Sequence, residues 1–246
     1  MNTHTIVSQE EWDAAQKEFL IKEKEFTHLR DAHSRARQAL PVVRVEKGYT
    51  FQGPEGSLTL LDLFGGQRQL IVYHLMFDPE DDAACKHCSC VVDNIAGSLV
   101  HLQGRATAFA AISRAPLPKI QAFKQRMGWT FPWVSSFGSD FNYDYRVTID
   151  PEKGFSTYNY ENFPHKGEMP GLSTFVRKGN EIFHGYSTYF RGLDIFLPMY
   201  HLLDATPLGR QEEDGRSMGA GAAGSWIEYH DRYGAKDSSP ATCCHG

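Results

Sequence analysis

The chain has 246 residues, of which 41% are hydrophobic and 22% are charged, so it can bury a sizeable core and is not wholly disordered. Its formal net charge of −5 argues against a nucleic-acid partner. No apolar run approaches the roughly 20 residues of a membrane helix, and the N-terminus lacks the pattern of a secretory signal. We therefore expect a soluble, cytoplasmic protein that does not associate with membranes.

The first predicted element is a long, charged helix that ends before Pro41. Ser8 and Glu11 have the spacing of a capping box, and a partly apolar stripe runs along the segment. A Gly-rich stretch after Asp204 reads as a linker. We therefore divide the chain into an N-terminal helical extension (1–40), a main domain (41–204) and a linker with a loose C-terminal tail (205–246).

The main domain alternates between strand and helix patterns. The predicted elements are two short strands at 42–45 and 49–51 around a Lys47-Gly48 turn, an apolar strand at 70–77, a helix from Cys85 to about Gln103, a strand at 107–112, a helix at about 117–127, a hairpin at 174–186 with its turn at Gly179-Asn180, and a helix at about 193–203 kinked by Pro198. A last short helix is expected at 226–233. The order strand–helix–strand–helix–hairpin–helix predicts a thioredoxin-like α/β fold, with a mixed sheet and helices on both faces.

The five cysteines are unevenly placed. Cys85, Cys88 and Cys90 lie together, whereas Cys243 and Cys244 precede His245 near the C-terminus. A C-x-x-C pair that begins a helix, just past the carboxyl end of a buried strand, indicates redox chemistry or metal binding. For the tail we expect a flexible end without a role, with metal binding or a vicinal disulfide as the alternatives.

The first hypothesis is a thiol–disulfide oxidoreductase. The backbone N–H groups and the dipole at a helix N-terminus favour a thiolate, so we expect Cys85 to be the exposed nucleophile. Cys88 lies three residues later on the same helix face and is expected to be the buried resolving thiol. Lys86 and His87 should lower the pKa of Cys85 below about 8.5. Cys90 falls on a more polar stripe and should lie outside the pair; the alternative for the pair itself is two inert, buried cysteines.

Five longer stretches carry a resemblance to a known family, namely residues 39–64, 69–79, 113–145, 173–194 and 202–213. On these stretches the chain resembles the bacterial thioredoxin-like family catalogued as domain of unknown function eight-nine-nine, often labelled a predicted dithiol-disulfide oxidoreductase. The resemblance implies a thioredoxin-like fold and no particular substrate. Two departures stand out. Pro170 lies a few residues before the position of the thioredoxin cis-proline, and Asp82 stands where peroxiredoxins have threonine.

The second hypothesis is a Cu(I)-binding protein of the thioredoxin fold or a copper-dependent enzyme. The Sco copper proteins use the same fold, with two cysteines at a helix start and a histidine from a facing loop. The comparable loop here contains His165, and two thiolates with an imidazole suit Cu(I). This reading makes Cys85, Cys88 and His165 the metal ligands. The redox reading needs no cofactor, and its partner is a small-molecule or protein thiol or disulfide.

The segment 129–145 concentrates aromatic residues in one irregular loop. A loop so rich in aromatic side chains is expected to cover the core or to form a homodimer interface. The alternative is the wall of a substrate pocket, in which Trp129, Trp133 and Arg114 would contact the substrate. Asp140 and Asp144 are further acid/base candidates, whereas His74 and His184 are expected to be packed in strands.

Overall fold

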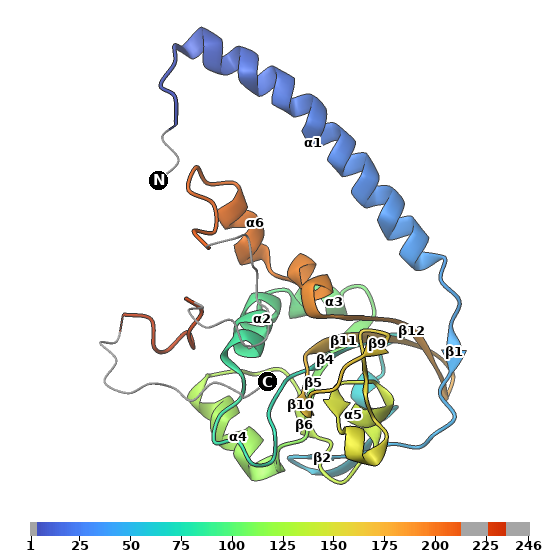
Figure 1. Cartoon of the computed structure of the whole chain (residues 1–246). Helices are drawn as coiled ribbons and strands as arrows, with labels where there is room; N and C mark the ends of the chain where they lie inside the picture. The colour runs from blue at the N-terminus through green and yellow to red at the C-terminus, as the bar shows by residue number, and fades with distance from the viewer. Residues whose placement is uncertain (1–3, 213–225, 235–246) are drawn as a thin grey trace. The chain divides into compact units, whose positions relative to one another are not determined.

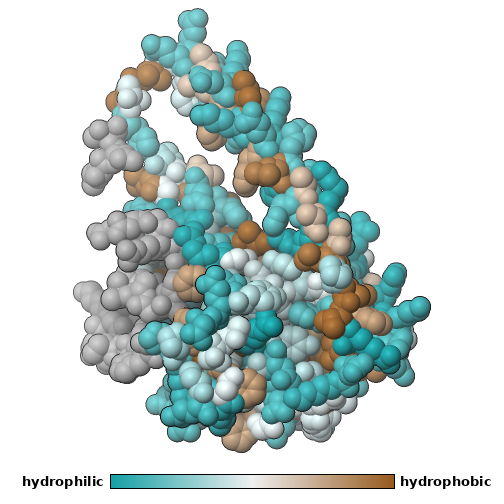
Figure 2. Space-filling model, turned by 45° about the vertical axis from the view of Figure 1, so that its right-hand side comes forward, coloured by the Kyte–Doolittle hydropathy of each residue, from teal (hydrophilic) through white to brown (hydrophobic). Residues whose placement is uncertain are grey.

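The computed structural model describes residues 4–212 and 226–234, and the chain divides into two compact units, 1–42 and 43–246 (Figure 1). The first unit contains helix α1 (Gln9–Gln38). The predicted capping box is confirmed: Glu11 N–H donates to Ser8 Oγ at 3.3 Å, and Ser8 N–H donates to Glu11 Oε2 at 2.9 Å. No residue of α1 is buried, and Phe26 and Leu29 are among its exposed apolar side chains. Figure 2 shows apolar residues (brown) along this helix.

Within the described residues of the second unit, eight strands form one mixed sheet in the order β1-β12-β11-β4-β5-β6-β2-β3. The strands are β1 (Val43–Arg44), β2 (Thr50–Gly53), β3 (Gly56–Thr59), β4 (Gln69–His74), β5 (Thr107–Ser113), β6 (Trp133–Ser135), β11 (Gly171–Lys178) and β12 (Glu181–Tyr189). β4 and β5 are parallel, β11 is antiparallel to β4, and β12 is antiparallel to β11. These four central strands have the thioredoxin arrangement.

The helices that follow the strands match the predicted order. They are η1 (Asp62–Phe64), α2 (Lys86–Ala96), α3 (Leu99–Gln103), α4 (Leu117–Arg126), α5 (Phe141–Asp144), η2 (Pro151–Lys153), η3 (Phe190–Phe196) and α6 (Pro198–Asp204). The expected helix from Cys85 to Gln103 is interrupted after Ala96, and the expected kink at Pro198 is a boundary between a 3-10 helix and an α-helix. Proline opens α6 because its missing N–H is not needed in the first turn.

Some local predictions were wrong. The strands around Lys47-Gly48 do not pair with each other: β1 pairs with β12 at one end of the sheet, and β2 pairs with β3 and β6 at the other. The expected helix at 226–233 is instead a segment without regular structure followed by a turn. Four two-residue strands were not predicted, namely β7 (Thr148–Ile149), β8 (Thr157–Tyr158), β9 (Glu161–Asn162) and β10 (Gly167–Glu168). Segments this short leave no periodicity to detect.

Alternation along the central strands divides the core into two clusters. Tyr73 of β4 packs with α2, α4 and α6, whereas its neighbour Val72 packs on the other face with η1 and α5. The same switch occurs in β5 between Ala111 and Ile112. Successive strand residues point to opposite faces, so an apolar strand covered on both sides supplies both clusters.

In the parts of the chain that the structure describes, every helix is too short or too polar to cross a membrane.

Gly171, the first residue of β11, lies close to the side chains of Tyr189 and Val147, so a substitution there tests this packing. A Cβ at this position would lie 2.9 Å from Cδ1 of Tyr189 and 3.0 Å from Cγ1 of Val147. We expect Gly171→Ala to lower the free energy of unfolding by about 1–3 kcal/mol, measured by chemical denaturation. The matched control is Gly97→Ala, where the added carbon meets nothing within 4 Å. Equal stability of the two variants would contradict this account.

Candidate active site

The site forms where β4 ends and α2 begins. Cys85 is the N-cap residue of α2, and its N–H donates to the Met76 carbonyl at 2.9 Å. The intervening loop is held from α4, because Lys119 Nζ donates to the carbonyls of Pro79 and Asp81, both at 2.8 Å. These bonds fix the start of α2 against the carboxyl end of the central strand, which is where open α/β sheets place their active sites.

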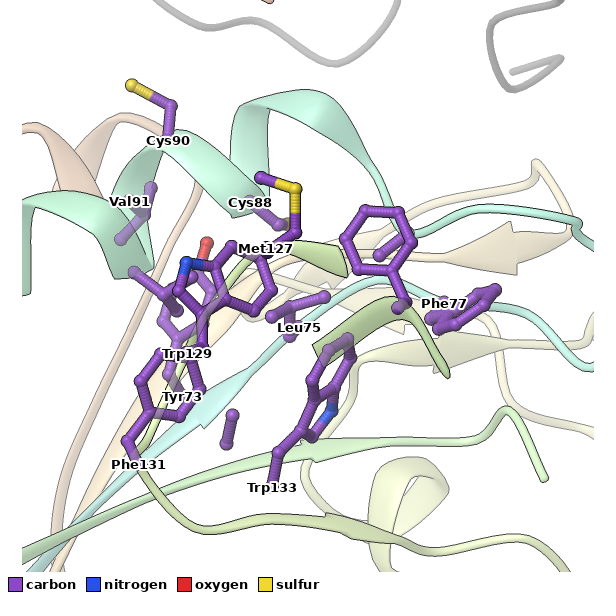
Figure 3. Packing of buried hydrophobic residues seen from close by; sticks show 14 of the residues in the cluster. Tyr73, Leu75, Phe77, Cys88, Cys90, Val91, Met127, Trp129, Phe131 and Trp133 are labelled. Atoms are coloured by element: carbon purple, nitrogen blue, oxygen red, sulfur yellow. The ribbon is translucent and has the colours of Figure 1, made fainter. Parts of the chain in front are cut away.

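The two thiols of the C-x-x-C pair differ in exposure as expected. Cys88 is buried in the cluster that covers one face of the sheet (Figure 3), whereas Cys85 is partly exposed. The two cysteines are not joined by a disulfide, and a hydrogen bond links their thiols. Cys85 Sγ also lies 4.0 Å from Nδ1 of His87. One turn of helix therefore brings together a reachable thiol, a buried thiol and an imidazole.

The expected low pKa of Cys85 is wrong for this structure. The hydrogen bond with Cys88 and burial together raise the pKa of the Cys85 thiol well above its usual range, while His87 acts in the opposite direction. Lys86, the second expected cation, is already engaged: its Nζ lies 2.8 Å from Oε1 of Glu228. The helix end is present as predicted, but the neighbouring thiol outweighs it.

A part of the chain that sequence patterns did not connect with the site lies directly on it. Residues 226–234, the C-terminal segment, pack against α2 and α4. Tyr229 Oη donates to the Ala84 carbonyl at 2.6 Å, and Glu228 pairs with Lys86. Ile227 is fully buried in the core cluster that also contains Cys88. The contacts with Ala84 and Lys86 fall on the two residues that flank Cys85.

The C-terminal segment is also held further along α2 and α4. Asp231 accepts two hydrogen bonds from Arg126, at 2.9 and 3.0 Å, and the guanidinium of Arg126 lies 4.8 Å from the centroid of the Tyr229 ring. His230 Nδ1 lies 2.9 Å from both carboxylate oxygens of Asp93. The only sequence signal for this docking was the return of aromatic and apolar residues after a Gly-rich stretch.

Two tyrosines also belong to the site and were not predicted. Tyr73 of β4 is fully buried, and burial followed by the neighbouring Cys88 raises its pKa well above the ordinary value. Tyr158 of β8 donates to the Pro170 carbonyl at 2.8 Å, and its pKa is raised by burial and by Cys88. Both read as core aromatics in the sequence, since the hydroxyl position depends on the fold.

Pro170 lies closer to the site than the sequence suggested. β11 begins at Gly171, so Pro170 directly precedes the strand next to β4. Every peptide bond among the described residues is trans.

Cys90 is buried, although its stripe was expected to be polar. Its sulfur accepts a hydrogen bond from Asn94 Nδ2 at 3.7 Å, and burial with the nearby Asp93 raises its pKa to about 12. Asn94 in turn accepts from the N–H of Met199 at 3.0 Å, which places this side of α2 against α6. The helical pattern of the sequence gives no sign of this contact with α6.

The expected substrate-contacting residues are engaged within the domain. Trp129 and Trp133 are buried in the core cluster, and their indole N–H groups donate to Asp93 at 2.7 Å and to Ser113 at 2.9 Å. Arg114 pairs with Glu168 at 2.8 Å. Burial raises the pKa of Glu168 to about 7 against the opposing effect of Arg114.

The remaining acid/base and histidine candidates also have partners. Lys47 Nζ contacts Asp140 at 2.8 Å and Asp144 at 2.7 Å. His74 Nε2 lies 2.8 Å from Ser173 Oγ, and His184 Nε2 lies 2.7 Å from Ser187 Oγ, as expected for histidines packed in strands.

The proposed copper ligands are not assembled. His165 is exposed, and its ring packs 5.4 Å from that of Phe163. Over residues 4–212 and 226–234, histidine, cysteine, aspartate and glutamate side chains form no group of three or more that could hold a metal ion. Cys243, Cys244 and His245 lie outside the described residues.

Comparison with known proteins identifies the family. The model of a family described as "Bacterial protein of unknown function (DUF899)" matches residues 1–233, so the chain belongs to this family. A search of curated proteins finds no match.

Among solved structures, the chain is similar to three peroxiredoxins. A cysteine mutant of Xanthomonas campestris peroxiredoxin Q is 13% identical, with a TM-score of 0.41, over 62% of this chain and 90% of that one. A cysteine mutant of Xylella fastidiosa PrxQ is 12% identical, with a TM-score of 0.43, over 66% and 94%. The mitochondrial 2-Cys peroxiredoxin of Plasmodium falciparum is 14% identical, with a TM-score of 0.40, over 65% and 92%. Similarity this low carries no argument about activity, and the fold assignment rests on the strand order.

The Cys85–Cys88 hydrogen bond gives a direct prediction. Cys88 is the largest influence raising the pKa of Cys85, so Cys88→Ala should move the pH midpoint of Cys85 alkylation downward. The measurement is iodoacetamide labelling against pH in a background in which Cys90, Cys243 and Cys244 are serine. A midpoint that stays fixed or rises would show that Cys88 does not control this thiol. As the control, restoring Cys90 in this background should leave the midpoint of Cys85 unchanged.

The ion pair with the C-terminal segment gives a second prediction. Glu228→Gln removes the charge that neutralises Lys86, so the lysine should stabilise the thiolate of the adjacent Cys85 more strongly. We expect the pH midpoint of Cys85 alkylation to fall by about half a pH unit, as for a partly exposed charge interaction. Glu152→Gln, which removes an exposed carboxylate paired with Lys166, is the matched control and should have no effect. Equal midpoints in both variants would count against the interaction.

Proposed function

We propose that this protein is a thiol–disulfide oxidoreductase that uses Cys85 as nucleophile and Cys88 as resolving thiol. The observation that carries the proposal is the pairing of a partly exposed N-cap thiol with a buried thiol one turn later, at the carboxyl end of the central strand of a thioredoxin-like sheet. Buried cysteines with no chemical role would not require one of the pair to be reachable from solvent.

The exchange follows from this arrangement. The Cys85 thiolate attacks one sulfur of a substrate disulfide, forms a mixed disulfide and expels the first substrate thiolate. The Cys88 thiolate then attacks Cys85 Sγ, forms the Cys85–Cys88 disulfide and expels the second. Two electrons pass from the protein to the substrate, and an external thiol of the compartment restores the dithiol. The raised pKa of Cys85 makes the reaction faster as pH rises toward the range where this thiol ionises.

The proposed partners are small-molecule or protein thiols and disulfides in the cytoplasm, and the exchange needs no cofactor. Lys86 and His87 tune the reacting pair in this proposal. Of the two, His87 already lies against the Cys85 sulfur, while Lys86 acts only when its pairing with Glu228 is loosened.

The test is dithiothreitol-driven reduction of a model disulfide by the purified full-length protein. Cys85→Ser should abolish turnover, because the thiol that attacks the substrate is removed. Cys88→Ser should trap a mixed disulfide that mass spectrometry detects on Cys85. Cys90→Ser is the matched control from the same helix and should retain turnover.

Two other results would replace the proposal. Turnover with hydrogen peroxide but not with disulfides would indicate a peroxidase, for which Cys85 would be oxidised to a sulfenic acid. Stoichiometric copper in the purified protein, lost on His165→Ala, would favour the Cu(I)-binding alternative formed by Cys85, Cys88 and His165. An active Cys85→Ser variant would exclude this thiol as the nucleophile.

A further inference from the structure

Tyr73 presents a buried hydroxyl that the exchange described above does not use. The side chain lies in β4, its relative exposure is 0%, and its hydroxyl forms no hydrogen bond of ordinary geometry. Burying a hydroxyl without a well-formed hydrogen bond destabilises the folded chain. A phenylalanine would fill the same space without this cost, so packing does not account for the hydroxyl.

The surroundings of this hydroxyl identify its partner. Tyr73 and Cys88 belong to the same core cluster, and Figure 3 shows the Tyr73 ring extending from β4 toward α2. The neighbours that act on the phenol are, in order, Cys88, Cys85 and Tyr158. Cys88 is thus the main neighbour of this hydroxyl, through its charge and a side-chain hydrogen bond, although the contact falls outside ordinary hydrogen-bond geometry.

We propose that the Tyr73 hydroxyl donates a hydrogen bond to the Cys88 thiolate and stabilises it during resolution of the mixed disulfide. This inference rests on the proposed function. A donor placed before charge develops stabilises that charge without a cost of reorganisation. The neutral thiol is a weak acceptor, so the contact with the hydroxyl becomes stronger when Cys88 loses its proton.

Cys88 is enclosed, with a relative exposure of 1%, and hydrogen bonds stabilise a buried thiolate. Once Cys85 is part of the mixed disulfide, its S–H no longer donates to Cys88. Tyr73 and Tyr158 are both influenced by this sulfur, and of the two Tyr158 already donates to the Pro170 carbonyl.

The titratable groups near Cys88 set the direction of proton movement. They are Cys85 and His87 on α2, Tyr73 on β4 and Tyr158 on β8. The pKa of Tyr73 is well above its ordinary value, so the phenol keeps its proton throughout the range in which thiols titrate. Tyr73 therefore acts as a donor and not as a base, and the proton of Cys88 leaves to solvent.

Reaction with dithiodipyridine has two steps, which distinguish the reaction of Cys85 from that of Cys88. Cys85 attacks the reagent, forms a mixed disulfide and releases one pyridine-thione. Cys88 then attacks Cys85 Sγ, forms the intramolecular disulfide and releases the second. Each released thiolate takes a proton from solvent, and two electrons pass from the dithiol to the reagent. The protein is the full-length chain in which Cys90, Cys243 and Cys244 are serine, followed by stopped-flow absorbance.

Tyr73→Phe keeps the ring and removes only the hydroxyl. We expect the first phase to be unchanged and the second to slow about tenfold at neutral pH, as for loss of a hydrogen bond to a charged group. The pH midpoint of the second phase should rise by about one unit. Tyr145→Phe is the matched control, because Tyr145 is a buried tyrosine on the opposite face of the sheet, and it should leave both phases unchanged.

The outcomes distinguish this inference from the function on which it rests. A second phase in Tyr73→Phe with the parent's rate and pH midpoint would overturn the role of Tyr73 while leaving dithiol exchange intact. Equal slowing of both phases would indicate a structural effect and would also overturn it. A parent protein that releases only one pyridine-thione would instead overturn the proposed function.

Discussion

The hydrogen bond from the Cys85 N–H to the Met76 carbonyl connects the first turn of α2 to the end of β4. The features of the candidate site depend on that connection. It sets Cys85 at the N-cap, and the geometry of the helix then turns Cys88 into the core cluster one turn later. The same connection brings α2 over Tyr73, so that a strand residue and a helix residue meet in the cluster.

The site is also defined by what is packed around it. The C-terminal segment supplies a carboxylate to Lys86 and a hydroxyl to the Ala84 carbonyl, on both sides of Cys85. A cation that would favour the Cys85 thiolate is therefore balanced by an anion from a distant part of the sequence. The charged residue that follows Cys85 is thus paired with a carboxylate more than a hundred residues away along the chain.

The pKa of Cys85 could not be predicted from the residues next to it in the sequence. A helix N-terminus, a lysine and a histidine next to Cys85 all favour the thiolate when considered alone. In the structure, the neighbouring thiol and burial raise the pKa of Cys85, and His87 only moderates the effect. Likewise Arg114, expected at a substrate pocket, pairs with a buried glutamate from β10. For both Cys85 and Arg114, the neighbour with the largest effect is one that packing brings into contact.

The sequence by itself determined the order of the main elements and the place of the dithiol. The apolar strand at β4, the helix that starts with C-x-x-C and the hairpin with its Gly-Asn turn each carry a local signal, because periodicity and turn preferences act over a few residues. The capping box of α1 is local in the same way. Tertiary structure alone decided which strands pair at the sheet ends, since β1 and β2 carry no mark of their partners. It also decided that Tyr73 packs in the cluster of Cys88 and that the C-terminal segment contacts Ala84 and Lys86, because contacts between residues far apart in sequence exist only in the folded chain.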